Sequence, residues 1–319
     1  MTDAVTVYRW DDVGAPSLES RKPSDIMKVV KACLVDGYGA KSPLGWSVVE
    51  DEIASAAPYL SLRNNMAQGG SGGVFTMGAA NDNTATYTRL HSHQEYTDKT
   101  TFAKSSYYYD VRELSKTTSA WMIIGTAKAF WFIKARYGHQ NYWNRQDDYS
   151  WIMFAGDMYS FIPNDPSTFV QVGKKGNGAN DTYHTEMPYL LTSTAPLEVL
   201  LTYPINNENT QLTSSLISPI GNGSFSLSNE YAAAAPTVNM LADLLIINGH
   251  HSMQYVNSAN DVNRPRLRGR LPGVKISGVS GWRNEAFPVI KTIHDQTYFQ
   301  MPDGYDKVSC VWIALEQWQ

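Results

Sequence analysis

The segment Trp151-Ile-Met-Phe-Ala-Gly-Asp-Met-Tyr-Ser-Phe-Ile-Pro163 decides the fold class, because it sets two apolar, aromatic runs around a Gly-Asp pair. Glycine reaches positive φ without strain, so Gly156-Asp157 predicts a tight hairpin turn between strands at 151–155 and 158–162. Aromatic and β-branched side chains fit a pleated surface that is buried on at least one face. The segment therefore predicts two paired strands deep in a β-rich domain, the second ending at Pro163.

The composition is that of a folded protein rich in strands and polar loops. Hydrophobic residues make up 43% of the 319 residues, aromatic residues 12% and charged residues only 18%. A chain of this length can bury one large core or two ordinary ones. Few charges and many tyrosines suit strands better than surface helices, and they also suit a protein that covers its surface with partners.

Other segments extend the same fold class. Residues 24–35 predict a helix with one apolar stripe, because Pro23 precedes it and Asp36-Gly37 follows it. Residues 120–124 and 127–135 predict a hairpin, and Gly69–Gly73 reads as a wide hairpin loop between two strands. We therefore expect a mainly β fold of antiparallel sheets or a sandwich, with one N-terminal helix and long polar loops.

Three regions are expected along the chain. Residues 1–106 form an N-terminal β region that contains the helix, and residues 107–205 form a central antiparallel β core. Residues 206–319 form a C-terminal β region, whose polar stretch at 206–239 predicts a loop-rich excursion.

Several function classes have no support in the sequence. The net charge of −4 gives no general reason to bind nucleic acid, and the apolar runs are too short for a membrane span. No phosphate loop, nucleophile elbow or C-x-x-C pair is present, and Cys33 and Cys310 predict buried free thiols. With no secretory signal visible, we expect synthesis in a reducing cytoplasm. The sequence predicts no catalytic, cofactor-binding or metal-binding residues.

His91-Ser-His93-Gln-Glu95 is the sharpest chemical alternative. Residues i, i+2 and i+4 of a strand share a face, so two imidazoles and a carboxylate would line one side and could hold a metal ion. The other interpretation is a solvated strand face, favoured because the opposite face, Leu90-Ser92-Gln94-Tyr96, is also mostly polar.

Arg266, Arg268 and Arg270 alternate, so on a strand they would also share one face. Such a row can meet carboxylates of a partner subunit, nucleic-acid phosphate or acidic groups of the same chain. No aromatic residues alternate with these arginines to stack on bases, so protein contact is preferred over nucleic acid.

An ordered series of short motifs resembles an uncharacterised family of tailed-bacteriophage virion proteins. Each motif alone is weak, and their order along nearly the whole chain carries the resemblance. The motifs are Val7-Tyr-Arg-Trp10, Gly37-Tyr-Gly-Ala-Lys41 with Gly45-Trp46, the Gly69–Phe75 turn, Thr86-Tyr-Thr-Arg89, Trp121–Ile124 with Phe130-Trp-Phe132, Phe154-Ala-Gly-Asp157 with Ser160-Phe-Ile-Pro163, and Arg268-Gly-Arg-Leu-Pro-Gly273. The family's Gly-Asp-Ala-Tyr ending is replaced here by Asn164-Asp-Pro-Ser167, and the two histidines are not part of the pattern.

The resemblance implies a structural component of the phage particle, in the tail, baseplate, neck or capsid decoration, without catalysis or cofactor. Expected partners are other virion proteins and further copies of the chain, and the expected location is the virion, assembled in the bacterial host cytoplasm. Two alternatives stay open. One is a receptor- or glycan-binding module that uses exposed aromatics such as Tyr107–Tyr109 or Trp143. The other is a metal-dependent hydrolase centred on His91, His93 and Glu95.

Overall fold

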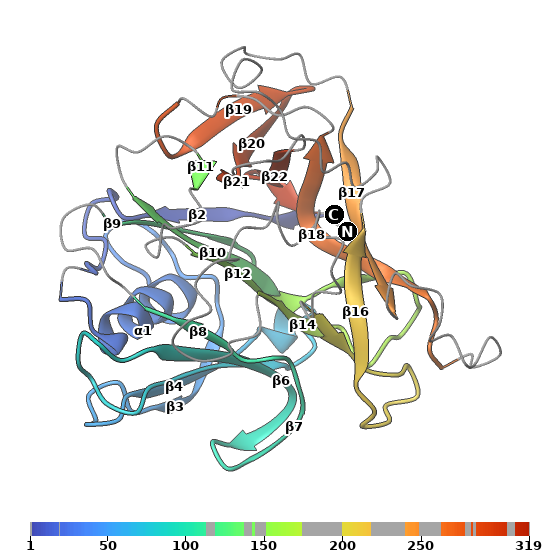
Figure 1. Ribbon diagram of the computed structural model, residues 1–319, viewed down its shortest axis with the longest axis horizontal. Coiled ribbons are helices and arrows are strands. Elements are labelled where there is room, and N and C mark those ends of the chain that lie inside the picture. Colours follow the sequence, from blue (N-terminus) through green and yellow to red (C-terminus); the bar gives the residue numbers. More distant parts are fainter. Residues whose placement is uncertain are drawn as a thin grey trace.

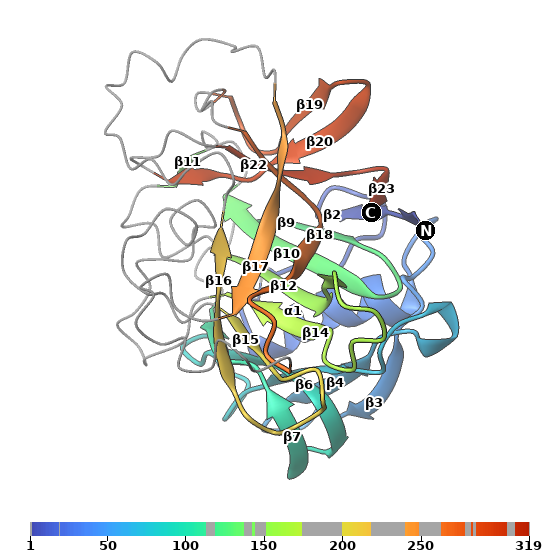
Figure 2. The same cartoon turned by 90° about the vertical axis from the view of Figure 1, so that its right-hand side faces the viewer.

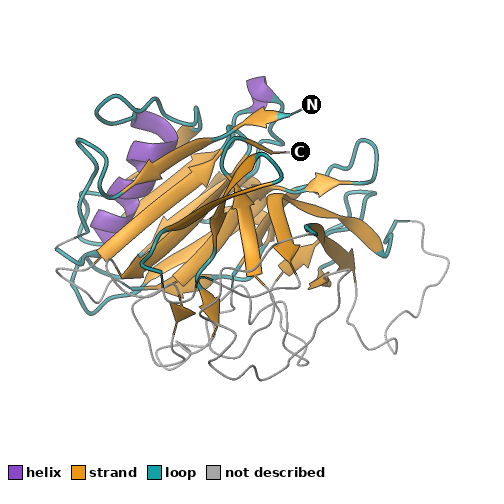
Figure 3. Ribbon diagram, turned by 90° about the horizontal axis from the view of Figure 1, so that it is seen from above, coloured by secondary structure: helices purple, strands orange, loops and turns teal. Residues whose placement is uncertain are grey.

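The computed structural model describes residues 2–18, 20–112, 119–136, 142–143, 151–173, 200–217, 240–248, 263–277, 282, 285–304 and 310–318. Within these residues the protein is mainly β, with several antiparallel sheets and one α-helix, as the sequence predicted. Strands dominate the molecule when it is seen from above, and the helix lies along one side (Figure 3). Three sheets form the body of the fold, stacked as layers (Figure 1).

The middle layer is a five-stranded antiparallel sheet. Its strands, in spatial order, are β14 (Phe169–Val172), β12 (Trp151–Asp157), β10 (Ala129–Arg136), β9 (Ser119–Gly125) and β2 (Thr6–Arg9). The predicted hairpin at 120–135 is confirmed, because β9 and β10 pair in register from Gly125↔Phe130 to Ser119↔Arg136.

Both faces of the middle layer are buried, and alternate residues of each strand enter two different cores. From β9, Met122 and Ile124 enter one hydrophobic cluster, whereas Trp121 and Ile123 enter the other. Successive side chains of a strand point to opposite faces, so a strand that is covered on both sides must be apolar at every position. This requirement explains the unbroken apolar run of β9.

One outer layer is a six-stranded sheet together with the helix. Its strands are β3 (Ser47–Asp51), β4 (Tyr59–Arg63), β5 (Val74–Gly78), β6 (Thr88–Asp98) and β7 (Thr101–Ser105), and β8 (Tyr109–Val111) pairs with β6. Residues 64–73, which include a 3-10 turn (Met66–Gln68), connect β4 to β5, and the two strands pair antiparallel. The predicted hairpin loop at Gly69–Gly73 is therefore confirmed as part of this connection.

The predicted helix is confirmed as α1 (Pro23–Lys31), which continues as a π-helical turn (Ala32–Asp36) before Gly37 at φ 77°. Its apolar stripe is buried against the six-stranded sheet and the middle layer. Cys33 in this turn and Cys310 are buried free thiols, as predicted. Among the described residues, no helix is long and apolar enough to span a membrane.

The other outer layer is an eight-stranded sheet from the C-terminal part of the chain. Its strands are β15 (Leu200–Thr202), β16 (Leu212–Ile217), β17 (Ala242–Asn248), β18 (Leu267–Ser277), β22 (Cys310–Ala314), β20 (Gln296–Gln300) and β19 (Val289–Ile293), and β13 (Tyr159–Ser160) pairs with β18. Figure 2 shows β16, β17 and β18 in front of the middle sheet, at an angle to its strands. Most of the predicted excursion, residues 218–239, lies outside the described residues.

Two short pairs complete the topology. Near the ends of the chain, β1 (Asp3–Ala4) pairs with β23 (Gln317–Trp318), and β11 (Tyr142–Trp143) pairs parallel to β21 (Asp303–Gly304). Strands pair across both predicted boundaries, β2 with β9 and β13 with β18, and the three-region division stays a prediction.

The predicted turn at Gly156-Asp157 is wrong. β12 runs straight through both residues, with Gly156 opposite Ala129 of β10 and opposite Val170 of β14. The residues that follow do not fold back on β12. They form β13, which pairs with β18 of the outer sheet, before the chain returns to the middle layer as β14.

Close packing, and not a turn, requires the glycine at position 156. Its φ is 137°, and a Cβ atom there would lie 2.3 Å from Ala129 Cα and 2.6 Å from the Lys128 carbonyl oxygen. No side chain fits at these distances, so the neighbouring hairpin approaches the backbone of β12 directly.

We expect Gly156→Ala to lower the free energy of unfolding by about 3 kcal/mol, because it adds both a steric overlap and backbone strain. Gly69→Ala is the matched control. Gly69 has φ 84°, but its Cβ would meet only Lys128 at 3.5 Å. That change should cost about 1 kcal/mol. Equal losses in urea unfolding would contradict the close-packing explanation.

Candidate functional site

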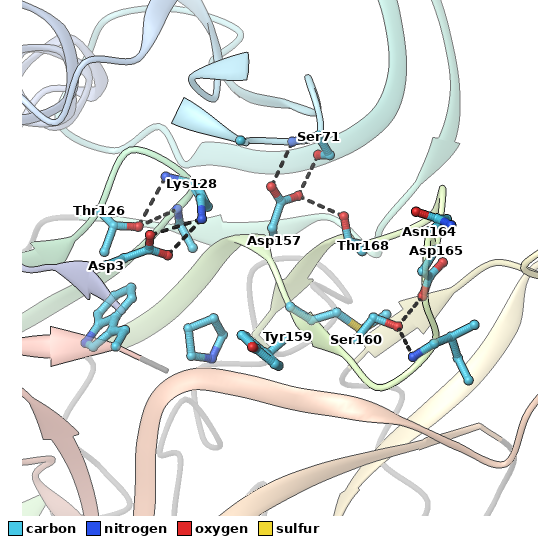
Figure 4. Close-up of a pocket in the computed structure, with 16 residues that line it drawn as sticks. Asp3, Ser71, Thr126, Lys128, Asp157, Tyr159, Ser160, Asn164, Asp165 and Thr168 are labelled. Atoms are coloured by element: carbon cyan, nitrogen blue, oxygen red, sulfur yellow. Dashed lines mark hydrogen bonds and ion pairs between the residues drawn. The ribbon is translucent and has the colours of Figure 1, made fainter. Parts of the chain in front are cut away.

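A pocket of about 590 Å³ lies where the middle sheet, the Gly69–Gly73 loop and β18 meet (Figure 4). We call it the junction pocket. Its polar lining includes Asp3, Ser71, Lys128, Asp157, Ser160 and Asp165. One of the motifs of the sequence resemblance, Phe154–Pro163, therefore contributes directly to its wall.

Asp157 holds the glycine-rich loop against the end of β12. Its carboxylate accepts hydrogen bonds from the Ser71 backbone N–H (2.8 Å), the Ser71 hydroxyl (2.5 Å), the Thr168 hydroxyl (3.1 Å) and the Asn64 amide (2.8 Å). Burial raises the pKa of Asp157, although these donors act to lower it. The side chain is thus a buried acceptor that ties three segments together.

The other two carboxylates of the junction pocket are also satisfied within the chain. Asp3 forms an ion pair with Lys128, with both oxygens 3.0 Å from Nζ. Asp165 pairs with Arg268 at 2.6 Å, and both side chains are almost completely buried. Each of the three carboxylates therefore has donors within the chain. These contacts connect segments of the chain that are distant in sequence.

The arginine row does not form a common face. Arg268 is the extra residue of a β-bulge in β18, because Ile246 pairs with Gly269 and Ile247 with Leu267. A bulge turns the following side chains relative to the regular alternation. Arg268 therefore points inward to Asp165, whereas Arg270 pairs with Asp243 at 2.5 Å. Of the three interpretations, acidic partners within the same chain are confirmed for these two arginines.

A second pocket, of about 630 Å³, lies on the outer face of the six-stranded sheet. We call it the histidine pocket, and its lining includes Tyr59, Thr76, Arg89, His91, His93 and Phe102. The inward-facing neighbours Phe75, Met77 and Leu90 belong to the hydrophobic core, so the alternating residues Thr76 and His91 face outward. The sequence favoured a solvated strand face, but β6 pairs with β5, β7 and β8, and His93 is only 2% exposed.

The two imidazoles are adjacent, with ring centroids 4.3 Å apart. His93 Nε2 lies 3.2 Å from the Thr76 hydroxyl, and His93 Nδ1 lies 2.7 Å from the Ser105 hydroxyl. His91 Nε2 lies 2.9 Å from the Ser106 carbonyl oxygen. A carbonyl only accepts, so Nε2 of His91 carries the proton and its Nδ1 is an acceptor. Burial lowers the pKa of both rings, that of His93 to about 3 with a further contribution from His91.

The predicted alternative of a His91, His93 and Glu95 metal site gains no support from this geometry. Glu95 forms an ion pair with the buried Lys104 at 2.6 Å, and both ring nitrogens of His93 already have hydroxyl partners. In the described part of the chain, no group of three or more His, Cys, Asp or Glu side chains is placed to hold a metal ion.

The aromatic residues proposed from sequence for sugar stacking lie elsewhere. Tyr109 is buried in the core, and the ring of Tyr108 is covered by the Arg89 guanidinium at 3.9 Å. The side chain of Trp143 lies outside the described residues. The structure instead places Phe102, 44% exposed, beside the histidines. No local motif marks Phe102, because its position depends on the pairing of β7 with β6.

We expect Asp157→Ala to lower the free energy of unfolding by about 3 kcal/mol, because four donors lose their shared acceptor. Limited proteolysis should then cut within residues 69–73. Asp98→Ala is the matched control, since Asp98 also accepts from a backbone N–H and a hydroxyl, both of Thr100, but on the surface. A loss for Asp157→Ala no larger than that of the control would show that the Asp157 contacts do not hold the loop.

The buried histidines predict acid sensitivity. His93 is neutral in the folded protein down to about pH 3, whereas in the unfolded chain it gains a proton below about pH 6.5. Stability is therefore lost as the pH falls through this range, by about 2 kcal/mol between pH 7 and pH 5 from His93 alone. Urea midpoints at the two pH values should show a smaller difference for His93→Gln. The exposed His294, replaced by Asn, should leave the difference unchanged, and an unaltered difference in His93→Gln would contradict the assignment.

Neither family models nor curated proteins supply a relative of this chain. No family model matches the chain, and no curated protein matches it either. The function must therefore be inferred from the sequence landmarks and from the contacts that their residues make.

Proposed function

We propose that the chain is a structural component of a tailed-bacteriophage particle, in the tail, baseplate, neck or capsid decoration. The observation that carries the proposal is the structural role of the residues in the motifs that resemble the virion family. The motifs that resemble the virion family supply close packing and buried ties between sheets, and none of them supplies a reactive constellation among the described residues.

Two glycines of the Arg268–Gly273 motif illustrate this role in close packing. A Cβ atom at Gly269 would lie 2.3 Å from the Tyr159 carbonyl oxygen, where β13 pairs antiparallel with β18. A Cβ atom at Gly273 would lie 2.1 Å from the Trp318 ring. At both positions, the lack of a side chain lets another segment approach the glycine backbone directly. Such packing favours a rigid building block over a catalyst that needs movable groups.

A surface suited to protein contact lies beside the junction pocket. Tyr159 and Phe161, at alternate positions of the segment that pairs with β18, are 44% and 42% exposed. The Arg270 guanidinium lies over the Tyr159 ring at 5.0 Å. Tyrosine, phenylalanine and arginine are enriched at protein–protein interfaces, where they act as anchors. We assign this aromatic pair to contacts with neighbouring particle proteins.

We expect mass spectrometry of purified phage particles that encode this chain to find it at a fixed ratio to the other virion proteins. The double change Tyr159→Ser and Phe161→Ser should reduce its incorporation more than about tenfold, because it removes two interface anchors. The melting temperature should change little, since neither residue belongs to a buried core cluster.

The matched control is Val13→Ser with Met240→Ser, two apolar residues that are 90% and 55% exposed at other places. This control should incorporate normally. Particles that contain no copy of the chain would overturn the proposed function. Normal incorporation of the Tyr159 and Phe161 double variant would overturn the assigned contact surface alone.

A further inference from the structure

The histidine pocket has the size and position of a small-ligand site. Its volume of about 630 Å³ falls within the range of known ligand pockets, and it lies on the sheet face that points away from the core. Five strands, β4 to β8, and the loops that join β5 to β6 and β6 to β7 contribute to it. Gly78, Ala79 and Ala80 keep one side free of large side chains.

The charges that line this pocket are already neutralised within the chain. Arg89 makes a bidentate pair with Asp110 at 2.9 and 3.0 Å, and Lys99 contacts both oxygens of Glu52 at 2.7 and 2.8 Å. Burial lowers the pKa of both imidazoles, so His91 and His93 are uncharged at neutral pH. An ionic ligand would therefore meet no unpaired opposite charge, and a neutral ligand fits better.

Aromatic rings supply the apolar part of the lining. Phe102 is 44% exposed, and its ring lies 4.4 Å from His93 and stacks on Tyr96 at an interplanar angle of 8°. Tyr59 and Tyr87 also line the pocket. An exposed ring that is held on its other sides by neighbouring rings offers a rigid apolar surface to a flat, partly apolar ligand.

Polar groups with remaining hydrogen-bonding capacity surround the rings. The Asn81 carbonyl oxygen accepts from Thr86 and Asn83, which leaves its amide nitrogen as a donor. Arg89 contacts Asp110 through Nε and Nη2, so Nη1 remains a donor, and His91 Nδ1 remains an acceptor. These groups offer donors and an acceptor to hydroxyls, which can both donate and accept.

We propose that the histidine pocket binds a neutral sugar residue of a glycan. Sugar rings combine an apolar C–H face, which would pack on Phe102, with hydroxyls that match Asn81, Arg89 and His91. Because Arg89 and Lys99 are each already paired with a carboxylate, the pocket favours neutral sugars over uronic or sialic acids. This assignment goes beyond the particle role and does not depend on it.

Saturation-transfer NMR and titration calorimetry on the full chain test the assignment. The probes are methyl glycosides of glucose, galactose, mannose and N-acetylglucosamine, with glucuronic acid and N-acetylneuraminic acid as charged counterparts. At least one neutral sugar should bind at least about tenfold more tightly than both acids. Its addition should also shift the imidazole resonances of His91.

Variants at position 102 locate the binding. Phe102→Leu keeps the apolar volume but removes the ring, so it should weaken binding about tenfold, whereas Phe102→Tyr should retain it. Leu267→Ala is the matched control, because Leu267 is similarly exposed, at 46%, but lies outside the pocket. The proposal is overturned if no neutral sugar binds at millimolar concentration, if the acids bind equally well, or if Phe102→Leu binds like the unaltered chain.

Discussion

Burial of the five-stranded middle sheet on both faces is the constraint on which the rest of the structure depends. One face packs on the eight-stranded sheet, and the other packs on the six-stranded sheet and α1. Neither outer layer can be removed without exposing a row of tryptophan, phenylalanine and isoleucine side chains to water. Because burial of apolar area is the main favourable term in folding, the two cores and their shared sheet form one cooperative structure.

The sequence predicted those elements whose signal is local. The apolar runs of β9 and β10 and the apolar stripe of α1 were found where the sequence predicted them. Gly156-Asp157 was misread, because glycine serves both tight turns and close backbone approach. The residue that requires the glycine, Ala129, is distant in sequence and reaches it only through strand pairing. A single local pattern does not distinguish these two uses.

The candidate sites were less predictable for the same reason. Alternation correctly placed His91 and His93 side by side, but it did not reveal that Glu95 would pair with Lys104. For the arginines, a bulge in β18 broke the alternation that the prediction assumed, and the buried partner Asp165 comes from another part of the chain. Pairing partners and bulges are tertiary features, so spacing alone determines which residues can share a face but not what they contact.

The segment between β12 and β14 has a mechanical consequence. It leaves the middle layer, bonds to β18 through β13, and returns, so one stretch of chain crosses between two layers and back. Sliding of one sheet along the other would have to separate the buried Arg268–Asp165 pair, and an uncompensated buried charge is costly. The layers are therefore fixed against shear by directional hydrogen bonds and a buried ion pair, a property that apolar packing alone, being non-directional, does not provide.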